Sequence, residues 1–317
     1  MPESGSHWHV LGAGSIGCLW GAHLALSGCA VTLLLRGTKA TEALARDGGI
    51  LLTEGHQQHL VTVKGESVTA KAEPCANVLV TTKAHQTMDA LGAISSRIVT
   101  GTCLLLLQNG MGMAQQIAEA YPHATLLVGS TTEGAWRRDR FHVVHAGRGT
   151  TWLGSGHSPI GDEIRERMVS EFARTDLEAS WDHNIGLRLW RKLAINCAIN
   201  PLTALCNCRN GELPRGRRSR HLLEEVCREI DQVLACEGIA LGQSTLDLAV
   251  EVAQATASNR SSMLQDLSDG QRTEIDWING YLVSRAAEHG IQVPLNRFLV
   301  DLVLAAESVR DKPGGSR

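Results

Sequence analysis

Three glycines near the start of the chain constrain its fold more than any other feature of the sequence. Gly12, Gly14 and Gly17 form a G-x-G-x-x-G loop that follows a strand-like run and opens a helix-like stretch at residues 15–26. In that context the first glycine permits a tight turn, the second lets the backbone approach a pyrophosphate, and the third allows close helix–strand packing. A glycine-rich turn that serves packing alone is the plainer alternative. The loop predicts dinucleotide binding at a helix N-terminus by Gly12, Ala13, Gly14, Ser15, Ile16 and Gly17.

The residue after the second strand-like run, at 30–35, indicates which dinucleotide is bound. An acidic residue about 20 positions after the loop would hydrogen-bond the ribose hydroxyls and favour NAD. Here Arg36 stands 19 residues after Gly17, and the first acid of the region is Glu42. Because a guanidinium forms bidentate, charge-assisted hydrogen bonds to a phosphate, Arg36 predicts NADP(H) as the cofactor.

The composition excludes several classes of partner. The chain has 317 residues, enough for roughly two domains. A net charge of −3 and an aromatic fraction of 4% argue against a nucleic-acid partner. Because the sequence contains no apolar run long enough to span a bilayer, a membrane partner is not expected either. We therefore expect a small-molecule partner, and the sequence leaves open whether the chain is a monomer or a homodimer.

The cysteines and the N-terminus predict the cellular compartment of the protein. Nine irregularly spaced cysteines and an N-terminus without a signal-peptide pattern favour a reducing, cytoplasmic compartment. The close pair Cys206 and Cys208 lacks zinc-like spacing to a further Cys or His, so no metal site is predicted. The glycine-containing tail at residues 312–317 is expected to be disordered.

The order of predicted elements divides the chain into two domains. Residues 1–182 alternate strand-like and helix-like stretches, which is typical of a doubly wound, mostly parallel sheet with helices on both faces. Residues 183–317 carry only helix-length stretches punctuated by glycine and proline. The predicted fold is therefore an α/β Rossmann-like NADP-binding domain at 1–182, followed by an all-α substrate domain at 183–317.

Some local elements are predicted from shorter patterns. A strand pair is expected at 48–63, and an antiparallel edge at 141–144 and 151–153. A helix at 185–205 should kink or open a turn at Asn200-Pro201, because proline removes one N–H and clashes with the preceding turn. A single helix is expected at 273–288. The basic run 215–220 is expected to be a solvated interhelical loop, with binding of an anionic partner as the alternative.

Polar residues follow two of the strand-like runs, where ligands bind in doubly wound sheets. Lys83 comes directly after the run at 78–82, and Asn109 follows the run at 103–107. Both are candidates for contacts to the nicotinamide half of the cofactor or to its substrate. The plainer interpretation of Lys83 is a solvated loop lysine. Asn109 is more plainly a turn residue, because Asn-Gly favours turns.

The predicted helix at 185–205 carries a polar stripe between apolar residues. Lys192, Asn196 and Asn200 follow one another at intervals of four residues and share one helix face. Asn destabilises a helix by up to about 0.7 kcal/mol relative to Ala, and burying an unpartnered amide costs more. The stripe therefore indicates a ligand, unless it is the solvated face of the helix.

A third group of candidates lies further along the chain. Ser262 and Glu274 each stand near the start of a predicted helix. Both residue types also occur as helix caps or in first turns, which is the structural alternative. Capping and ligand binding are compatible, because a helix N-terminus suits an anionic substrate.

In their order along the chain, these residues resemble the ketopantoate reductase (2-dehydropantoate 2-reductase) family. The resemblance extends from about residue 8 to residue 295. The matching segments are the Gly12–Gly17 loop with Arg36, TKAHQ at 82–86, QNGMG at 108–112, KLAINCAINPLTA at 192–204, NG at 210–211, SSMLQD at 261–266 and EIDWING at 274–280. Each motif alone is weak, whereas the ordered set is specific.

The resemblance implies NADPH-dependent reduction of ketopantoate to (R)-pantoate, a step in pantothenate and coenzyme A biosynthesis. It implies that Lys192 is the general acid and that Glu274 is a catalytic residue beside both ligands. Cofactor contacts are implied for the Gly12–Gly17 loop, Arg36, Lys83, Asn109, Ala135 and Glu274. Substrate contacts are implied for Asn109, Asn196, Asn200, Asn210 and Ser262.

Two segments depart from the family pattern. Glu133 stands where a neutral or imidazole side chain is more familiar, and the run at 215–220 is unusually basic. Both departures leave room for a different 2-keto acid as the substrate, and reduction of an imine on the same scaffold is a further alternative. A non-catalytic protein that senses NADP(H) is the alternative from another class, although the pair Lys192 and Glu274 argues against it.

Overall fold

The computed structural model describes residues 6–310, and the chain divides into two compact units. The first unit runs to Gln108 and continues over Met113–Ile185. The second contains Asn109–Gly112 and the residues from Gly186 onward. The predictions made for the extreme N-terminus and for residues 312–317 lie outside the described range.

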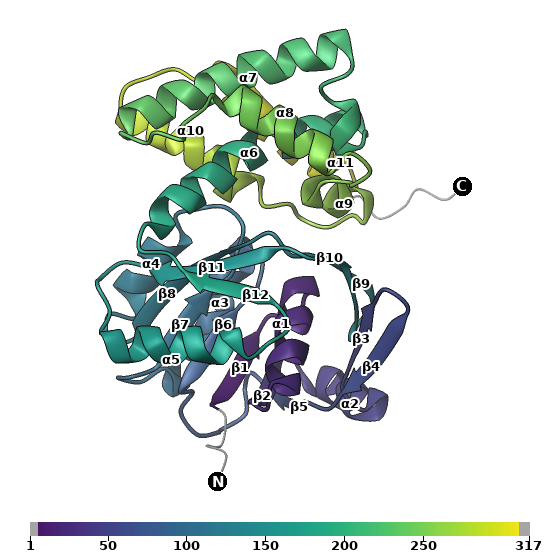
Figure 1. The fold of residues 1–317 in the computed structure, drawn as a ribbon, viewed down its shortest axis with the longest axis vertical. Helices are drawn as coiled ribbons and strands as arrows, with labels where there is room; N and C mark the ends of the chain where they lie inside the picture. The colour runs from purple at the N-terminus through teal and green to yellow at the C-terminus, as the bar shows by residue number, and fades with distance from the viewer. Residues whose placement is uncertain (1–5, 311–317) are drawn as a thin grey trace. The chain divides into compact units, whose positions relative to one another are not determined.

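The first unit is built on an eight-stranded sheet (Figure 1). The strand order is β12-β11-β8-β7-β6-β1-β2-β5. The six parallel strands are β1 (His7–Leu11), β2 (Ala30–Leu35), β5 (Lys64–Ser67), β6 (Asn77–Val80), β7 (Cys103–Leu106) and β8 (Thr125–Thr131). Strand β11 (Thr150–Ser155) pairs antiparallel with β8, and β12 (Glu178–Trp181) pairs parallel with β11. The predicted doubly wound, mostly parallel sheet is confirmed.

The position of the glycine-rich loop follows from this topology. Consecutive strands extend in opposite directions from β1, toward β2 and β5 on one side and toward β6, β7 and β8 on the other. The carboxyl ends of β1 and β6 therefore flank the switch point, which is where doubly wound sheets bind ligands.

Five α-helices accompany the strands in the described part of the first unit. They are α1 (Ser15–Leu26), α2 (Thr38–Asp47), α3 (Ala84–Ala93), α4 (Met113–Ala120) and α5 (Asp162–Ala173), with the short 3₁₀ helix η1 (Ser95–Arg97) after α3. The predicted bounds of α1 and β2 agree with the structure at both ends. The elements α2, α5, β5 and β12 were not predicted. Strands β5 and β12 are short, α5 is rich in charged residues, and the buried face of α2 offers only Ala40, Ala43 and Leu44.

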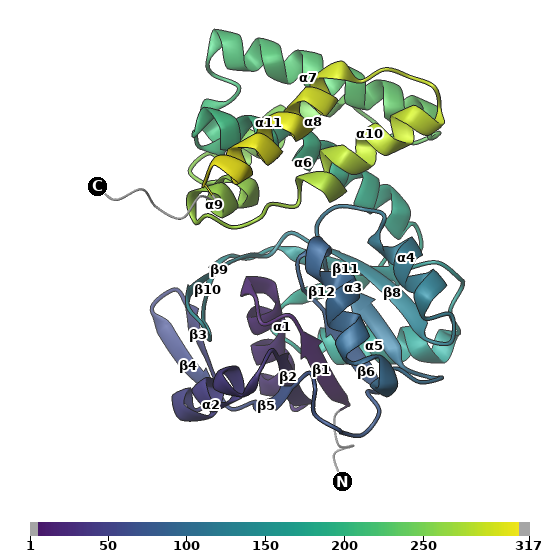
Figure 2. The same ribbon diagram turned by 180° about the vertical axis from the view of Figure 1, so that it is seen from behind.

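A second, four-stranded sheet lies on the other side of α1 (Figures 1 and 2). It contains β3 (Ile50–Glu54), β4 (Gln57–Val61), β9 (Gly134–Asp139) and β10 (His142–Gly147) in the order β4-β3-β10-β9. The strand pair expected at 48–63 is confirmed as the antiparallel pair β3 and β4. The antiparallel edge expected from 141–144 and 151–153 is wrong. Strand β10 pairs with β3 and β9, whereas β11 crosses to the larger sheet and pairs with β8.

The described part of the second unit is helical, as predicted. Its α-helices are α6 (Ile185–Cys206), α7 (Arg217–Cys236), α8 (Thr245–Ala255), α9 (Ser262–Ser268), α10 (Asn279–Glu288) and α11 (Pro294–Arg310). Two 3₁₀ helices, η2 (Asn210–Glu212) and η3 (Ile275–Trp277), connect them. Helix α6 contributes Leu193, Cys197 and Ala198 to the core of this unit. None of the helices in residues 6–310 is long and apolar enough to cross a membrane.

The proline inside α6 is accommodated without ending the helix. A turn was one of the two outcomes expected at Asn200-Pro201, and it is wrong, because α6 continues through Pro201 to Cys206. Proline lacks the N–H that would bond the carbonyl of Cys197, four residues earlier. The side-chain amide of Asn279 donates to that carbonyl over 3.0 Å and replaces the lost bond. A partner from α10 therefore explains why the helix survives.

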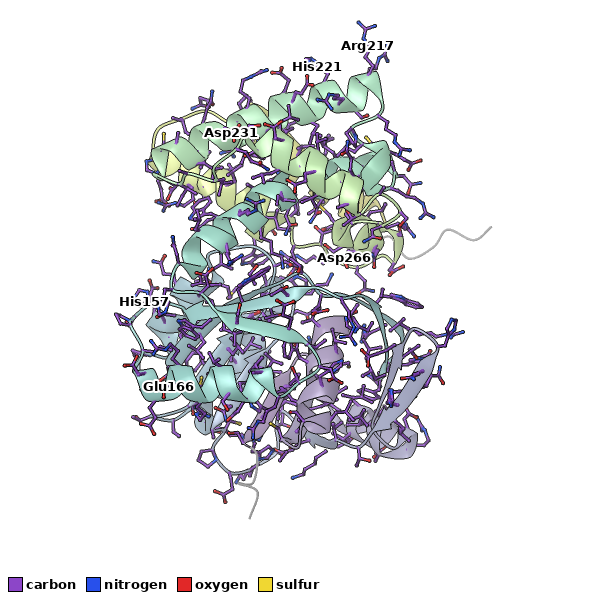
Figure 3. The ribbon with its side chains drawn as sticks, in the orientation of Figure 1. His157, Glu166, Arg217, His221, Asp231 and Asp266 are labelled. Carbon is purple, nitrogen blue, oxygen red and sulfur yellow. The ribbon has the colours of Figure 1, made fainter. Side chains whose placement is uncertain are left out.

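Two further expectations are wrong in the helical unit. The helix expected at 273–288 is divided, because Ile278 (φ −100°, ψ −93°) separates η3 from α10. The basic run at 215–220 is mostly helical rather than a loop, since α7 begins at Arg217. Figure 3 shows Arg217 projecting outward from that end of α7, with His221 one turn further along. The run is thus an exposed first turn.

Candidate active site

The glycine-rich loop joins β1 to α1 and has no room for side chains at two of its three glycines. Gly12 adopts a φ of +112°, and a Cβ there would lie 2.5 Å from the backbone nitrogen of Thr82. A Cβ on Gly17 would lie 2.0 Å from the carbonyl oxygen of Gly12. The hydroxyl of Thr81 donates to the same oxygen over 2.6 Å. The fold of the loop itself therefore requires Gly12 and Gly17.

Gly14 is different, because the space beside it is open. The nearest heavy atom to a Cβ at Gly14 would be the carbonyl oxygen of Thr81, at 4.0 Å, and its φ of −82° suits any residue. Gly14 is also the N-cap residue of α1. Packing does not explain this glycine, whereas close approach of a pyrophosphate to the backbone does.

Replacing Gly14 with Ala is expected to leave the fold intact and to weaken dinucleotide binding by about tenfold or more. The methyl group fits the protein but occupies the space into which the pyrophosphate would come. Thermal unfolding and fluorescence titration with the dinucleotide measure the two effects separately. Gly21→Ala in α1 is the matched control, because its Cβ would meet the nearest atom at 3.5 Å, an ordinary contact. Unchanged dinucleotide affinity in Gly14→Ala would contradict the role of this glycine.

Two basic residues predicted to bind the cofactor lie at neighbouring strand ends. Arg36 follows β2, is exposed, and donates from Nη2 to Oε1 of Gln86 on α3 over 2.9 Å. Lys83 is the half-buried N-cap residue of α3 and follows Thr82, against which Gly12 packs. In the sheet, β2 and β6 are the two neighbours of β1. The structure thus places Arg36 and Lys83 beyond the carboxyl ends of the two strands that border β1.

A second guanidinium near the loop was missed from the sequence. Arg137 on β9 donates from Nη1 to the carbonyl oxygen of Ala13 over 3.2 Å. Ala135 lies two residues earlier on β9, so it faces the same side of this strand. Arg137 stands within the charged run at 137–140, which resembles a solvated hairpin, so no local pattern distinguishes it. The contact to Ala13 makes Arg137 a further candidate for cofactor binding.

Glu133, one of the departures from the family pattern, is bound within the protein. It is buried, and its Oε2 lies 2.7 Å from Nε2 of His145. The backbone N–H of Gly149 donates to the same oxygen over 3.0 Å. The Glu133 carboxylate therefore has structural partners of its own.

The polar stripe on α6 is present as predicted, and its first member has a shifted pKa. Helix α6 includes Lys192, Asn196 and Asn200, and Asn200 is buried. Burial lowers the pKa of Lys192 to about 8, against the opposing effect of the Glu274 carboxylate. Glu274, directly before η3, is only 7% exposed. An acid with a pKa close to the working pH is well suited to donate a proton.

Asn109 belongs to the same group. Its Nδ2 donates to Oε2 of Glu274 over 3.3 Å. The following residues pack on η3, since the N–H of Met111 donates to the carbonyl of Trp277 over 2.9 Å. The Glu274 side chain makes no capping hydrogen bond, so capping does not account for it. Lys192, Glu274 and Asn109 therefore form one polar group within the second unit.

Helix capping at the start of α9 falls to Ser261 rather than to Ser262. The Ser261 hydroxyl oxygen accepts hydrogen bonds from the Leu264 N–H over 3.1 Å and from the hydroxyl of Thr203, on α6, over 2.8 Å. Oγ1 of Thr203 also lies 3.0 Å from the carbonyl oxygen of Asn200. Ser262 is the exposed first residue of α9. The start of α9 and the middle of α6 are thus directly connected, while the Ser262 hydroxyl does not serve as the cap.

Asn210 retains one unsatisfied polar atom. It is buried at the start of η2, and its Nδ2 donates to the hydroxyl of Thr256 over 2.9 Å. Within residues 6–310, its buried Oδ1 has no hydrogen-bond partner. A buried acceptor without a donor is unfavourable, so Asn210 is a candidate to receive a hydrogen bond from a ligand hydroxyl or amine.

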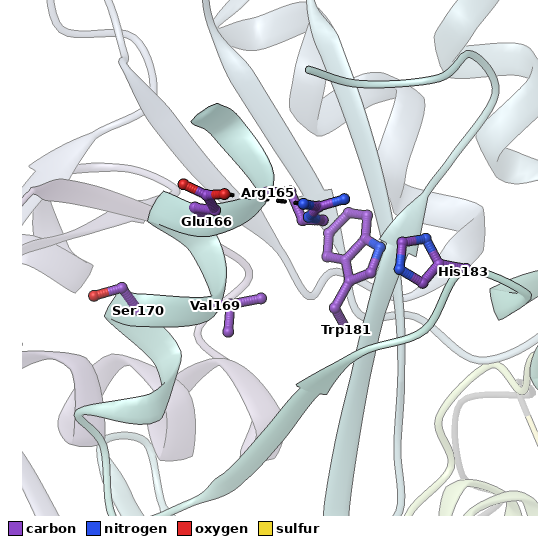
Figure 4. A pocket seen from close by; sticks show the side chains of 6 residues that line it. All are labelled: Arg165, Glu166, Val169, Ser170, Trp181 and His183. Atoms are coloured by element: carbon purple, nitrogen blue, oxygen red, sulfur yellow. Dashed lines mark ion pairs between the residues drawn. The ribbon is translucent and has the colours of Figure 1, made fainter. Parts of the chain in front are cut away.

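One surface hollow lies apart from these groups. It measures about 440 Å³ and lies between α5 and the end of β12 (Figure 4). Its lining includes the ion pair Arg165–Glu166, whose closest atoms are 3.9 Å apart, and the rings of Trp181 and His183. None of the predicted site residues contributes to the lining, so the hollow does not bear on the predicted chemistry.

Comparison with known families gives matches over nearly the whole chain. The family model described as ketopantoate reductase PanE/ApbA matches residues 8–158, and its C-terminal counterpart matches residues 184–307. A 2-dehydropantoate 2-reductase of Shigella flexneri is 36% identical over 310 residues, which is 96% of each chain. A 2-dehydropantoate 2-reductase of Halobacterium salinarum is 36% identical over 302 residues, covering 94% of this chain and 98% of the relative.

Solved structures agree with the architecture. A PanE/ApbA family ketopantoate reductase of Ralstonia eutropha is 28% identical with a TM-score of 0.86, covering 96% of this chain and 99% of the other. A D-mandelate dehydrogenase solved with NADH and anilino(oxo)acetate has the same TM-score and coverage at 23% identity. The second likeness, at this low identity, concerns the fold alone.

Proposed function

Because this chain belongs to the ketopantoate reductase family and is an oxidoreductase of that family, we propose that it reduces ketopantoate to (R)-pantoate with NADPH. The reaction would contribute to pantothenate and coenzyme A biosynthesis. The observation that carries the proposal is the polar group in the second unit, in which buried Glu274 accepts a hydrogen bond from Asn109 and influences the pKa of Lys192. The likeness to reductases at 36% identity supports the substrate.

The first unit supplies the cofactor contacts in this proposal. The pyrophosphate binds against the backbone around Gly14. Arg36, oriented by Gln86, pairs with the 2′-phosphate. The family resemblance implies that Lys83 and Ala135 also contact the cofactor. No acidic residue stands at the Arg36 position to bind a ribose hydroxyl, which supports NADPH over NADH.

The helical unit supplies the acid. When bound, NADPH would supply the hydride for the ketone carbon, and negative charge would develop on the ketone oxygen. The Lys192 ammonium hydrogen-bonds this oxygen and transfers a proton to it, which is worth about 10²–10⁴-fold in rate. Glu274 accepts a hydrogen bond from the substrate hydroxyl and orients Lys192, while Asn109 holds Glu274.

The remaining polar residues recognise the substrate in this proposal. Asn196 and Asn200 continue the polar face of α6 beyond Lys192. The unsatisfied Oδ1 of Asn210 accepts a hydrogen bond from a substrate hydroxyl, and Ser262 hydrogen-bonds the carboxylate. A 2-keto acid with a further hydroxyl group fits these donors and acceptors.

The pH dependence of ketone reduction should follow the ionisation of Lys192. Its pKa is lowered to about 8, and the reaction needs the protonated form. We expect kcat/KM for reduction to be constant below pH 8 and to fall tenfold per pH unit above it, while alcohol oxidation rises over the same range. Initial rates from pH 6 to 10 measure both limbs. A reduction profile that stays flat to pH 10 would contradict the assignment.

An NADPH-oxidation assay tests the substrate. The panel comprises ketopantoate, smaller and bulkier 2-keto acids and a cyclic imine, each with NADPH and with NADH. The proposal expects the highest kcat/KM for ketopantoate with NADPH. A higher value for another acid or imine would overturn ketopantoate as the substrate. Tight NADPH binding without turnover of any acceptor would indicate a sensor.

A further inference from the structure

A cluster of ionisable side chains, two buried and one half-buried, lies beside Glu133 in the first unit. His23 is in the last turn of α1, Glu54 is the last residue of β3, and His145 is on β10. One nitrogen of each histidine and one carboxylate oxygen of Glu54 all lie within 4.8 Å of one another. Nδ1 of His145 is 2.9 Å from Oε1 of Glu54, and Nε2 of His23 is 3.7 Å from the same oxygen.

His23 is the member that ordinary packing does not explain. Its side chain is 1% exposed, and across residues 6–310 neither ring nitrogen has a hydrogen-bond partner. Burying a polar group without a partner is unfavourable, and the adjacent positions of α1 hold apolar residues, Ala22 and Leu24. Because Nε2 of His23 lies near Glu54, a group bound between these three side chains would supply the partner that His23 lacks.

His145 is already held as a metal-ligating histidine is held. Its Nε2 faces the Glu133 carboxylate at 2.7 Å, and its Nδ1 faces Glu54. Ligating histidines typically donate their second ring N–H to a carboxylate, which fixes the tautomer and leaves the other nitrogen to bind the metal. Glu133 is itself held by the N–H of Gly149. The supporting shell of a metal site is therefore present before any metal binds.

We propose that His23, Glu54 and His145 bind one Zn²⁺ ion. Two imidazole nitrogens and a carboxylate oxygen are a donor set that zinc accepts at about 2.0–2.2 Å, and a water completes its tetrahedron. Ligand atoms in such a tetrahedron are about 3.3 Å apart, and the nitrogens of His145 and His23 lie 2.9 and 3.7 Å from Oε1 of Glu54. The ion ties the dinucleotide-binding helix α1 to the four-stranded sheet through β3 and β10. The site is independent of the proposed reductase activity.

An ion pair without metal is the competing explanation for part of the cluster. His145 between Glu54 and Glu133 would be satisfied as a charged imidazolium, since both nitrogens have carboxylate partners. That arrangement leaves both nitrogens of His23 without hydrogen-bond partners. A metal accounts for His23, and the sequence could not reveal it because the ligands come from three distant segments rather than from one spaced motif.

Zinc binding to the full-length protein tests the proposal. After treatment with a chelator and dialysis, Zn²⁺ alone is titrated at pH 7.5 against a chromophoric competitor. We expect one ion per chain, and an unfolding temperature raised by about 5 °C when zinc is in hundredfold excess over its dissociation constant. His23→Gln and Glu54→Gln should each weaken binding at least about tenfold. His142→Gln is the matched control, because His142 lies on β10 beside Thr53 and outside the cluster.

The exposed cysteines provide the second control. Cys206 is exposed and Cys208 half-buried, so a Cys206→Ser/Cys208→Ser variant must keep the zinc for the proposal to stand. Co²⁺ bound to the parent protein in place of Zn²⁺ should give the absorption of a tetrahedral site without a thiolate charge-transfer band. This measurement tests the ligand set even if a ligand variant folds poorly. The proposal is overturned by absent stoichiometric binding, by unchanged affinity in His23→Gln, or by a thiolate band.

Discussion

Replacing Lys192 with Ala is expected to lower kcat for ketone reduction by about 10²–10⁴-fold, with little change in NADPH affinity or unfolding temperature. The variant loses both the proton donor and the positive charge that stabilises the developing alkoxide. Cofactor affinity should survive because the proposed phosphate contacts come from the first unit. Initial-rate kinetics, fluorescence titration with NADPH and thermal unfolding measure the three quantities.

A neighbouring cation is the control for Lys192. Arg191 is exposed on the same helix, so Arg191→Ala removes an equal charge without removing the acid. Its turnover should stay within about twofold of the parent, since exposed charges contribute little. Lys192→Arg keeps the charge but replaces the acid with one whose pKa is too high to transfer the proton readily, so it should recover only part of the loss. Near-normal turnover in Lys192→Ala would refute the role of this lysine.

Replacing Arg36 with Ala is expected to lower the preference for NADPH over NADH by about 10- to 100-fold. The guanidinium is exposed at the end of β2 and is oriented by Gln86, so it is available for a charge-assisted pair with the 2′-phosphate. A hydrogen bond to a charged group is worth about 1.5–3 kcal/mol, which corresponds to this range. The ratio of the two kcat/KM values, measured in the same buffer, gives the result.

The control for Arg36 is another exposed arginine of the same region. Arg46 lies in the last turn of α2, and Arg46→Ala should leave the cofactor preference unchanged. Gln86→Ala should lower the preference for NADPH by an intermediate amount, because it removes the hydrogen bond that orients the Arg36 guanidinium but keeps the guanidinium itself. An unchanged NADPH:NADH ratio in Arg36→Ala would show that another residue selects the cofactor.

The sequence was most informative where one local rule determines the structure. The loop from Gly12 to Gly17 could be placed between a strand and a helix because backbone conformation and close packing leave no alternative to glycine at two positions. The stripe from Lys192 to Asn200 could be placed on one face because helical periodicity alone decides it. These two patterns account for most of the predicted site.

Contacts between distant segments could not be predicted in the same way. Asn279, on another helix, stabilises α6 at Pro201, and Arg137, on another strand, hydrogen-bonds Ala13. The crossing of β11 into the larger sheet also depends on pairing rather than on its own residues. Each depends on tertiary structure, which outweighs local preference. Roles of the individual site residues remain predictions for the experiments above.

The tetrapeptide Asn109–Gly112 has a consequence for how the chain matures. It is translated with the first half of the protein but belongs to the compact unit formed by the second half, where Met111 bonds Trp277. As the polypeptide leaves the ribosome, the parallel sheet can assemble early, whereas these four residues must wait for the last third of the message to be read. Severing the gene at the boundary near residue 185 would therefore yield a helical fragment that lacks a native piece of itself.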